Sequence, residues 1–305
     1  MSFKKFKISI FDTPNFKYNK IQSLADLQAF ENEDELANLP LPYPELVTPL
    51  WAYGRMQSWG EDSPIFKARV LAEFPEEGED TLISLHLVER SLVKEFDEEE
   101  WEVRTRCNVI GIDVARFGDD RTVFTSVDNT KVIDIKWHQG KDTMKTVGVA
   151  IGMFNDMGYH KEFDWFVVDD TGVGGGVSDR LIELGYNVLR VNFGEKSEDE
   201  RFVNLKAEIY WYLRDQFKDD KMCLIDKGAL VGEIPMIKYE FNSSGCIGIV
   251  SKKKMKAAGQ KSPDFSDSLA LAIWGTRLAT SDNATIDPEI GHEDTIVGNI
   301  MEKVF

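Results

Sequence analysis

Three short segments of the chain place aspartate where an apolar element ends or begins. Residues 110–113 read Ile-Gly-Ile-Asp, residues 166–169 read Phe-Val-Val-Asp, and residues 263–267 read Pro-Asp-Phe-Ser-Asp before an apolar stretch. The first two patterns predict buried strands that end in a carboxylate, and the third predicts the first turn of a helix. Burying a charged carboxylate without a partner is costly. A fold that brings these carboxylates together builds a site for hard divalent metal ions, which prefer oxygen ligands.

The candidate catalytic residues and metal ligands are Asp113, Asp169 and Asp264, with Asp267, Asp120 and Asp170 as supporting ligands. The strand ending at Asp113 is predicted to be central, so its carboxylate and that of Asp169 can face the same end of a sheet. An aspartate at a helix start, such as Asp264, is more often only a cap, although the helix dipole also stabilises carboxylates there. Together the residues predict a site for two divalent cations, Mg²⁺ or Mn²⁺, that hydrolyses phosphodiester bonds.

The net charge of the chain argues against an enzyme that binds DNA tightly without partner proteins. Its 305 residues include 53 acidic and 36 basic ones, a net charge of −17, whereas proteins that hold DNA by themselves usually show a basic surface. We therefore expect weak binding to free DNA. One dense basic run precedes Asp264 and forms either a solvated loop or a contact with the phosphate backbone; it consists of Lys252, Lys253, Lys254, Lys256 and Lys261.

Other kinds of site find little support in the sequence. Glycine-rich residues 169–176 follow a predicted strand, but no Lys-Ser or Lys-Thr comes after them, which excludes a Walker A phosphate loop. These glycines are better explained by a sharp turn of the backbone close to the site. The three cysteines form no CxxC pair, and the four histidines lack metal-ligand spacing. No segment approaches the ~20 apolar residues of a membrane span, so we expect a cytoplasmic protein without membrane contact.

From residue 107 onward the pattern predicts a mixed α/β sheet flanked by helices. An antiparallel meander of three strands is expected first, followed by helices that alternate with parallel strands, then a hairpin and a last helix. The expected strands are 107–115, 121–127, 131–138, 163–169 and 186–192, the expected helices are 141–156, 174–184, 201–217 and 264–280, and the hairpin joins 237–242 to 246–251.

The first hundred residues have a different character. Residues 8–11 are predicted as a short strand, residues 34–49 as a proline-rich extended connector and residues 50–73 as helical. We therefore predict a domain end and linker over residues 1–105, an α/β domain over 106–280 and a C-terminal tail over 281–305.

At the level of motifs, the chain resembles the nuclease domain of the large terminase subunit of tailed bacteriophages, which has a ribonuclease H-like fold. Residues 111–123 (GIDVARFGDDRTV) look like the first catalytic strand of that family, residues 168–174 (VDDTGVG) with 177–181 (VSDRL) like its second acidic segment, and residues 264–272 (DFSDSLALA) like its third. Residues 8–16, 59–64 and 69–75 resemble the end of the terminase ATPase domain and the segment that links it to the nuclease. No Walker A or Walker B motif is present, so we expect no ATPase activity from this chain alone.

The resemblance implies a metal-dependent endonuclease that cuts concatemeric viral DNA for packaging. Its implied partners are double-stranded DNA, the ATPase motor, the small terminase subunit and the portal. Its implied location is the cytoplasm of a bacterial host, and a prophage origin is one alternative that stays open. A nuclease that other subunits hold against DNA gains effective concentration and does not need tight binding of its own.

Two alternatives remain open at the level of sequence. A ribonuclease H-like junction resolvase or related recombination nuclease would use the same acidic residues, but would not explain the segments upstream of residue 106. A non-catalytic terminase remnant that serves as a docking module would bind no metal through Asp113 and Asp264.

Overall fold

The computed structural model describes residues 7–61, 63–73, 78, 80–94, 108–115, 120–140 and 142–277. The chain divides into two compact units, the first made of residues 1–88 with 226–237 and the second of residues 89–225 with 238–305. Residues 226–237, predicted within the α/β domain, thus belong with the N-terminal unit. The predicted boundary at residue 105 and the predicted tail at 281–305 fall outside the described residues.

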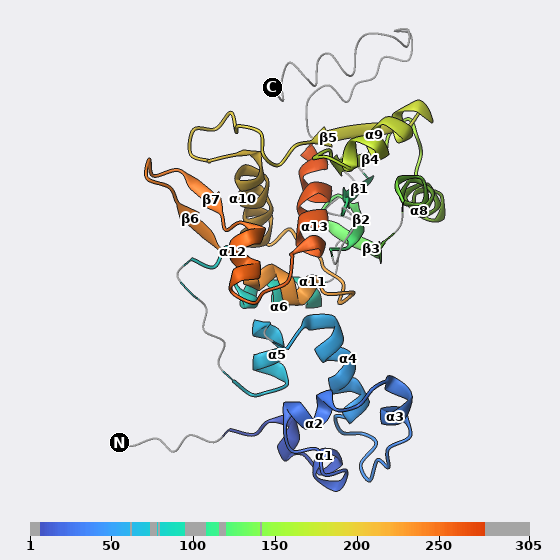
Figure 1. Cartoon of the computed structure of the whole chain (residues 1–305), viewed down its shortest axis with the longest axis vertical. Helices are drawn as coiled ribbons and strands as arrows, with labels where there is room; N and C mark the ends of the chain where they lie inside the picture. The colour runs from blue at the N-terminus through green and yellow to red at the C-terminus, as the bar shows by residue number, and fades with distance from the viewer. Residues whose placement is uncertain are drawn as a thin grey trace. The chain divides into compact units, whose positions relative to one another are not determined.

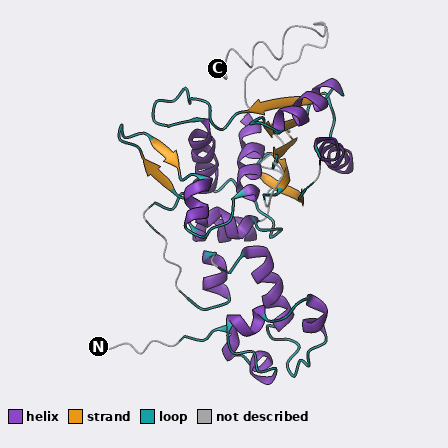
Figure 2. Ribbon diagram, viewed as in Figure 1, coloured by secondary structure: helices purple, strands orange, loops and turns teal. Residues whose placement is uncertain are grey.

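The N-terminal unit is helical in its described part (Figures 1 and 2). The strand predicted at residues 8–11 is wrong: these residues lead into a 3-10 turn, in which the Ser9 amide and hydroxyl both donate to Asp12 Oδ2. A serine or threonine cap followed by proline defines other helix starts, as where Thr48 precedes Pro49 and Ser63 precedes Pro64. The elements are η1 (Ile10–Asp12), α1 (Pro14–Tyr18), α2 (Leu24–Gln28), α3 (Glu33–Ala37), α4 (Pro49–Trp59), α5 (Pro64–Arg69), α11 (Leu230–Glu233) and η2 (Ile234–Met236), while α6 (Leu85–Val93) crosses into the second unit.

The second unit contains a five-stranded mixed sheet of order β3-β2-β1-β4-β5. Its strands are β1 (Asn108–Asp113), β2 (Thr122–Asp128), β3 (Lys131–His138), β4 (Trp165–Asp169) and β5 (Asn187–Val191). The first three strands pair antiparallel, and β4 and β5 continue the sheet in parallel from β1. The predicted meander with added parallel strands is confirmed, and β1 is the central strand.

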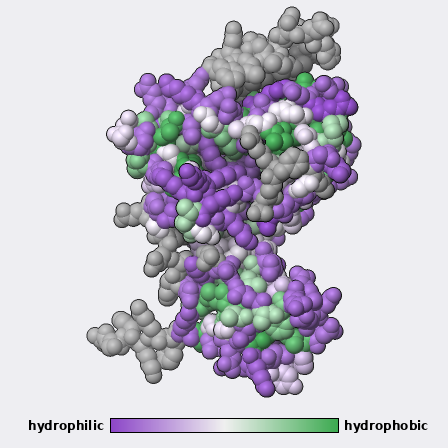
Figure 3. Space-filling view, in the orientation of Figure 1, coloured by the Kyte–Doolittle hydropathy of each residue, from purple (hydrophilic) through white to green (hydrophobic). Residues whose placement is uncertain are grey.

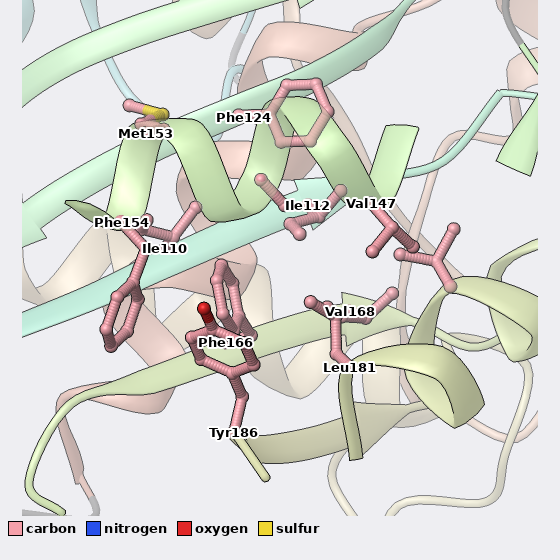
Figure 4. Close-up of a cluster of buried hydrophobic side chains, with 12 residues drawn as sticks. Ile110, Ile112, Phe124, Val147, Met153, Phe154, Phe166, Val168, Leu181 and Tyr186 are labelled. Carbon is pink, nitrogen blue, oxygen red and sulfur yellow. The ribbon is translucent and has the colours of Figure 1, made fainter. Parts of the chain in front are cut away.

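Helices cover both faces of this sheet (Figure 1). On one face α8 (Thr143–Asp156) and α9 (Gly174–Glu183) bury an apolar cluster against alternate strand residues. Figure 4 shows Ile110, Ile112 and Phe166 of the sheet in this cluster with Phe154 and Leu181 of the two helices. On the other face lies α13 (Asp264–Gly275), and α10 (Leu205–Lys218) packs against α13.

Gly111 lets α13 approach the sheet at backbone distance. A Cβ atom on Gly111 would lie 2.3 Å from Ser268 O and 2.5 Å from the Ala272 amide nitrogen. Ser268 Oγ donates to Gly111 O at 3.0 Å, so the helix and the central strand are joined directly. This contact aligns the N-terminus of α13 with the end of β1.

The predicted hairpin is present as β6 (Tyr239–Phe241) and β7 (Ile247–Ile249), and a short helix, α12 (Lys252–Ala257), follows it.

The face of the molecule in Figure 3 is largely hydrophilic over the described residues. In the part of the chain that the structure describes, no helix has the length and apolarity needed to cross a membrane.

Candidate active site

The carboxylates predicted from the sequence meet at the carboxyl ends of β1 and β4. These strands are parallel neighbours with Ile112 opposite Val168, so Asp113 and Asp169, one residue further on, project from the same face of the sheet. That face is the one covered by α13, whose first turn contributes Asp264 and Asp267. Asp113 and Asp264 are each 4% exposed and Asp267 is fully buried, whereas Asp169 is half-buried.

Lys252, the first residue of α12, inserts its ammonium group among these carboxylates. Its Nζ atom lies 2.9 Å from Asp267 Oδ2, 3.3 Å from Asp264 Oδ1 and 3.4 Å from Asp113 Oδ2. One cation thus faces three nearly buried carboxyl groups. The positive charge of Lys252 compensates the negative charge of the carboxylate cluster around it.

Asp267 is additionally held from α10. Tyr210 Oη donates to Asp267 Oδ1 at 2.7 Å, and Lys206 Nζ lies 2.6 Å from the same oxygen. Because these groups occupy Oδ1, only Oδ2 faces Lys252 and the other carboxylates. Asp264 is oriented in a similar way, since the Arg121 amide donates to its Oδ2 at 2.9 Å.

The environment separates the pKa values of these neighbouring carboxyl groups. Burial raises the pKa of Asp113 to about 8 against the opposing effect of Lys252, and the nearby acidic groups act in the same direction as burial. Burial also raises the pKa of Asp169. For Asp267 the effect of burial is outweighed by Lys206 and Lys252, which hold its pKa well below the usual range. Asp267 is therefore the permanent anion of the group, whereas Asp113 gains a proton readily even with Lys252 beside it.

Two of the predicted supporting ligands do not join this group. Asp120 pairs with Lys256 at 2.9 Å, and Asp170, on the opposite side of the β4 backbone from Asp169, points toward Arg190 at 3.9 Å. The glycines after β4 do provide the predicted sharp turn, because a Cβ on Gly174 would lie 1.8 Å from Asp169 O.

Four residues of the lysine run lie on helix α12, and three of their side chains face acidic groups of this chain. Lys252 contacts the carboxylate cluster, Lys254 lies 2.7 Å from Glu240 and Lys256 pairs with Asp120. The run therefore offers less uncompensated positive charge to DNA than its sequence suggests. For Lys253 and Lys261 the assignment to DNA contact stays a prediction.

The roles of Lys206, Tyr210 and the inserted Lys252 were not foreseen from the sequence. Lys206 and Tyr210 lie four residues apart on α10, which places them on one helix face. A basic residue and a tyrosine on the buried face of a predicted helix are the only local signal for a buried acidic partner. Their partner, Asp267, lies 57 residues from Tyr210 in sequence, which no local pattern shows.

The donor set consists of carboxylate oxygens, which suits a hard divalent cation such as Mg²⁺ or Mn²⁺. As the side chains stand, no three His, Cys, Asp or Glu residues in the described ranges converge closely enough to hold an ion. The Lys252 ammonium lies between the carboxylates instead. The residues fit a metal site on the condition that Lys252 withdraws and the carboxylates close on the cation.

The structure is similar to solved structures of a terminase nuclease. The nuclease domain of the large terminase subunit gp2 of bacterial virus Sf6 matches with a TM-score of 0.53 and 21% identity, covering 63% of this chain and 98% of that one. A mutant of that domain with manganese and beta-thujaplicinol matches with a TM-score of 0.55 and 20% identity over 63% and 98% of the two chains. A mutant with calcium gives a TM-score of 0.53 and 21% identity, with the same coverage.

These similarities establish that the chain has the ribonuclease H-like fold of terminase large-subunit nuclease domains. No protein-family model and no curated protein sequence matches it.

Proposed function

We propose that this chain is a metal-dependent DNA endonuclease of a viral genome-packaging terminase. The observation that carries the proposal is that Asp113, Asp264 and Asp267 surround the ammonium group of Lys252, while Asp169 projects from the same face at the end of the neighbouring strand β4. The fold shared with terminase nuclease domains supports it. Asp113 is the central residue, since it lies on the central strand and the charges of the other three all act on it.

The proposed cofactor is a pair of divalent cations, Mg²⁺ or Mn²⁺. Asp113 would be shared by both ions, Asp169 and Asp264 would each help to hold one, and Asp267 would support them through its Oδ2 atom. Bound ions of this kind lower the pKa of water and stabilise the leaving oxygen of a phosphodiester.

The chain's own residues prepare this chemistry. Lys206 and Tyr210 keep Asp267 charged and fix its orientation, and the hydrogen bond from the Arg121 amide fixes the orientation of Asp264. Direct packing of α13 on β1 through Gly111 holds the helix carboxylates beside Asp113. Lys252 compensates the charge of these carboxylates in the metal-free protein, at the position where a divalent cation would supply the same positive charge.

The proposed substrate is concatemeric double-stranded DNA, cut in the cytoplasm of a bacterial host. The proposed partners are the terminase ATPase motor, the small terminase subunit and the portal. These partners would compensate for the net charge of −17 by holding DNA at the site.

The rival functions make different predictions. A junction resolvase would prefer branched DNA to linear duplex. A docking module without catalysis would bind no Mn²⁺ that depends on Asp113 and Asp264, which isothermal titration would reveal.

The decisive experiment compares Mn²⁺-dependent nicking of supercoiled plasmid by the wild type, Asp113→Asn and Asp170→Asn. Asp170 provides a matched control, because it follows Asp169 but its side chain points away from the group. We expect Asp113→Asn to abolish cleavage and Asp170→Asn to retain it. Full activity of a purified, folded Asp113→Asn protein would contradict the assignment.

A further inference from the structure

We propose that Arg121 and Trp137 form a contact surface for the DNA strand next to the carboxylate group. This inference rests on the proposed function and adds to it the residues that engage the substrate. The sequence patterns assign no role to either residue, although Arg121 lies within the segment 111–123 that carries the resemblance.

The sheet register places Trp137 beside the site. Asp113 is opposite Val123 on β2, and Val123 is opposite Trp137 on β3. Directly opposed residues share a face of the sheet, so Trp137 lies on the α13 face, two strand spacings or about 10 Å from Asp113 along the backbone. Its ring lies 5.4 Å from that of Phe265, the residue that follows Asp264.

Arg121 connects the aromatic residues to the carboxylates. Its amide donates to Asp264 Oδ2 at 2.9 Å, while its guanidinium group lies over the Phe265 ring, 5.7 Å from the centroid. Within the described residues the guanidinium group has no acidic partner, whereas Lys252, Lys254 and Lys256 all do. The charge of this guanidinium group is therefore not compensated by a carboxylate of the described part of the chain, so the group can bind a phosphate beside the site.

Trp137 supplies the apolar half of the surface. Its side chain is 47% exposed although it lies on a sheet face that a helix covers, while its neighbour Phe265 is 1% exposed. Phosphate contacts by arginine position a nucleic acid strand, and aromatic groups add contacts to its bases or sugars. Arg121 would therefore contact the phosphate of a nucleotide and Trp137 its base or sugar. Both residues lie next to the carboxylates that would take part in cleavage.

The alternative is that Trp137 only shields Phe265. In that case replacing Trp137 would lower the stability of the fold and leave DNA binding unchanged. The two possibilities are separated by measuring thermal stability together with binding.

The test measures fluorescence anisotropy of a short fluorescein-labelled DNA duplex with the full chain, without Mn²⁺ so that no cleavage occurs. The variants are Arg121→Ala, Trp137→Ala and Trp137→Phe. The matched controls are Arg180→Ala, an arginine paired with Glu183 on α9, and Phe163→Ala, an exposed aromatic residue before β4.

We expect Arg121→Ala and Trp137→Ala each to weaken binding about tenfold, with Trp137→Phe retaining most of the affinity. Between about 50 and 200 mM salt, Arg121→Ala should reduce the slope of log affinity against log salt by about one, because it removes one phosphate contact. Trp137→Ala should leave that slope unchanged. The control variants should bind as the wild type does.

Wild-type affinity in both Arg121→Ala and Trp137→Ala would overturn the inference, as would a wild-type protein that binds no duplex at low salt. Failure of the proposed function has a separate signature, namely a wild-type protein that binds duplex but does not nick plasmid with Mn²⁺.

Discussion

Ser268 on α13 donates its hydroxyl to the carbonyl oxygen of Gly111 on β1 at 3.0 Å, and this contact sets the position of the helix that carries two of the site carboxylates. The contact exists only because residue 111 has no side chain. The same glycine thus serves both the fold and the site.

Replacing Gly111 with alanine should strongly destabilise the second unit. The new Cβ atom would meet backbone atoms of α13 at 2.3–2.9 Å, so the helix itself would have to move, at a cost of about 3 kcal/mol. Gly152→Ala on α8 is the matched control, because a Cβ there meets nothing within 4 Å. That change should be neutral or stabilising by up to about 1 kcal/mol. Urea unfolding of both variants measures the difference, and equal effects would contradict the packing role of Gly111.

The stability of the metal-free protein should fall as pH rises, and Asp113 should cause much of the loss. The folded state raises the pKa of this group to about 8 from an ordinary value of 3.8, so the folded state binds the proton more tightly than the unfolded chain. The stabilisation is full below about pH 4 and is lost as pH rises through about 8. Asp113→Asn should therefore be more stable than the wild type at about pH 9, by on the order of 2 kcal/mol. Urea unfolding in EDTA at about pH 5 and about pH 9 checks this, and an unchanged pH slope in the variant would refute it.

Removing the ammonium group of Lys252 should make the site depend on a bound cation. Without Lys252, the buried Asp267 carboxylate loses one of the two cations that compensate its charge, so Lys252→Ala should melt at a lower temperature in EDTA. Its affinity for Mn²⁺ should rise about tenfold, because the ion no longer competes with the lysine. Calorimetric titration compares it with Lys253→Ala, the adjacent residue on α12. Equal Mn²⁺ affinity in the two variants would show that Lys252 does not compete with the cation.

Removing the Tyr210 hydroxyl should weaken the hold on Asp267. Tyr210→Phe deletes a hydrogen bond to a fully buried carboxylate, which costs about 1.5–3 kcal/mol. Tyr212→Phe is the control on the same helix, since the Tyr212 ring packs edge-on against Trp274 at 5.8 Å. Denaturant unfolding should separate the two variants. Comparable stability losses would mean that the hydroxyl contributes little to holding Asp267.

Residues 226–237 should be required by the N-terminal unit. Asp226 accepts a hydrogen bond from Trp59 Nε1 at 2.8 Å, and a Cβ on Gly232 would lie 1.9 Å from Trp59 O. Gly232→Ala should therefore accelerate hydrogen exchange of the α4 amides while α13 amides keep their protection. Uniform loosening of both helices would contradict the division into two units. The same division implies that a fragment limited to residues 106–280 exposes the buried side chains of Leu230, Val231 and Ile234.

Much of the fold follows from local patterns. Apolar runs that end in Asp113 and Asp169 define neighbouring strands, the short turn after residue 127 implies the meander, and the apolar helix that begins at Asp264 is evident from its periodicity. These features depend on residues close together in the chain, where period and turn chemistry are informative. The strand predicted at residues 8–11 failed because no strand among the described residues pairs with this short apolar run, which turns instead around Asp12.

The sequence by itself determined which carboxylates could form a site and which elements carry them. Only the tertiary structure decided which groups compensate the charge of each carboxylate. Lys252 enters the group from a helix that sequence assigned to DNA contact, Lys206 and Tyr210 reach Asp267 from α10, and Asp120 and Asp170 turn away toward basic partners. The physical reason is that the charge state of a buried carboxylate depends on the groups that surround it in space, and those groups come from segments far apart in the chain.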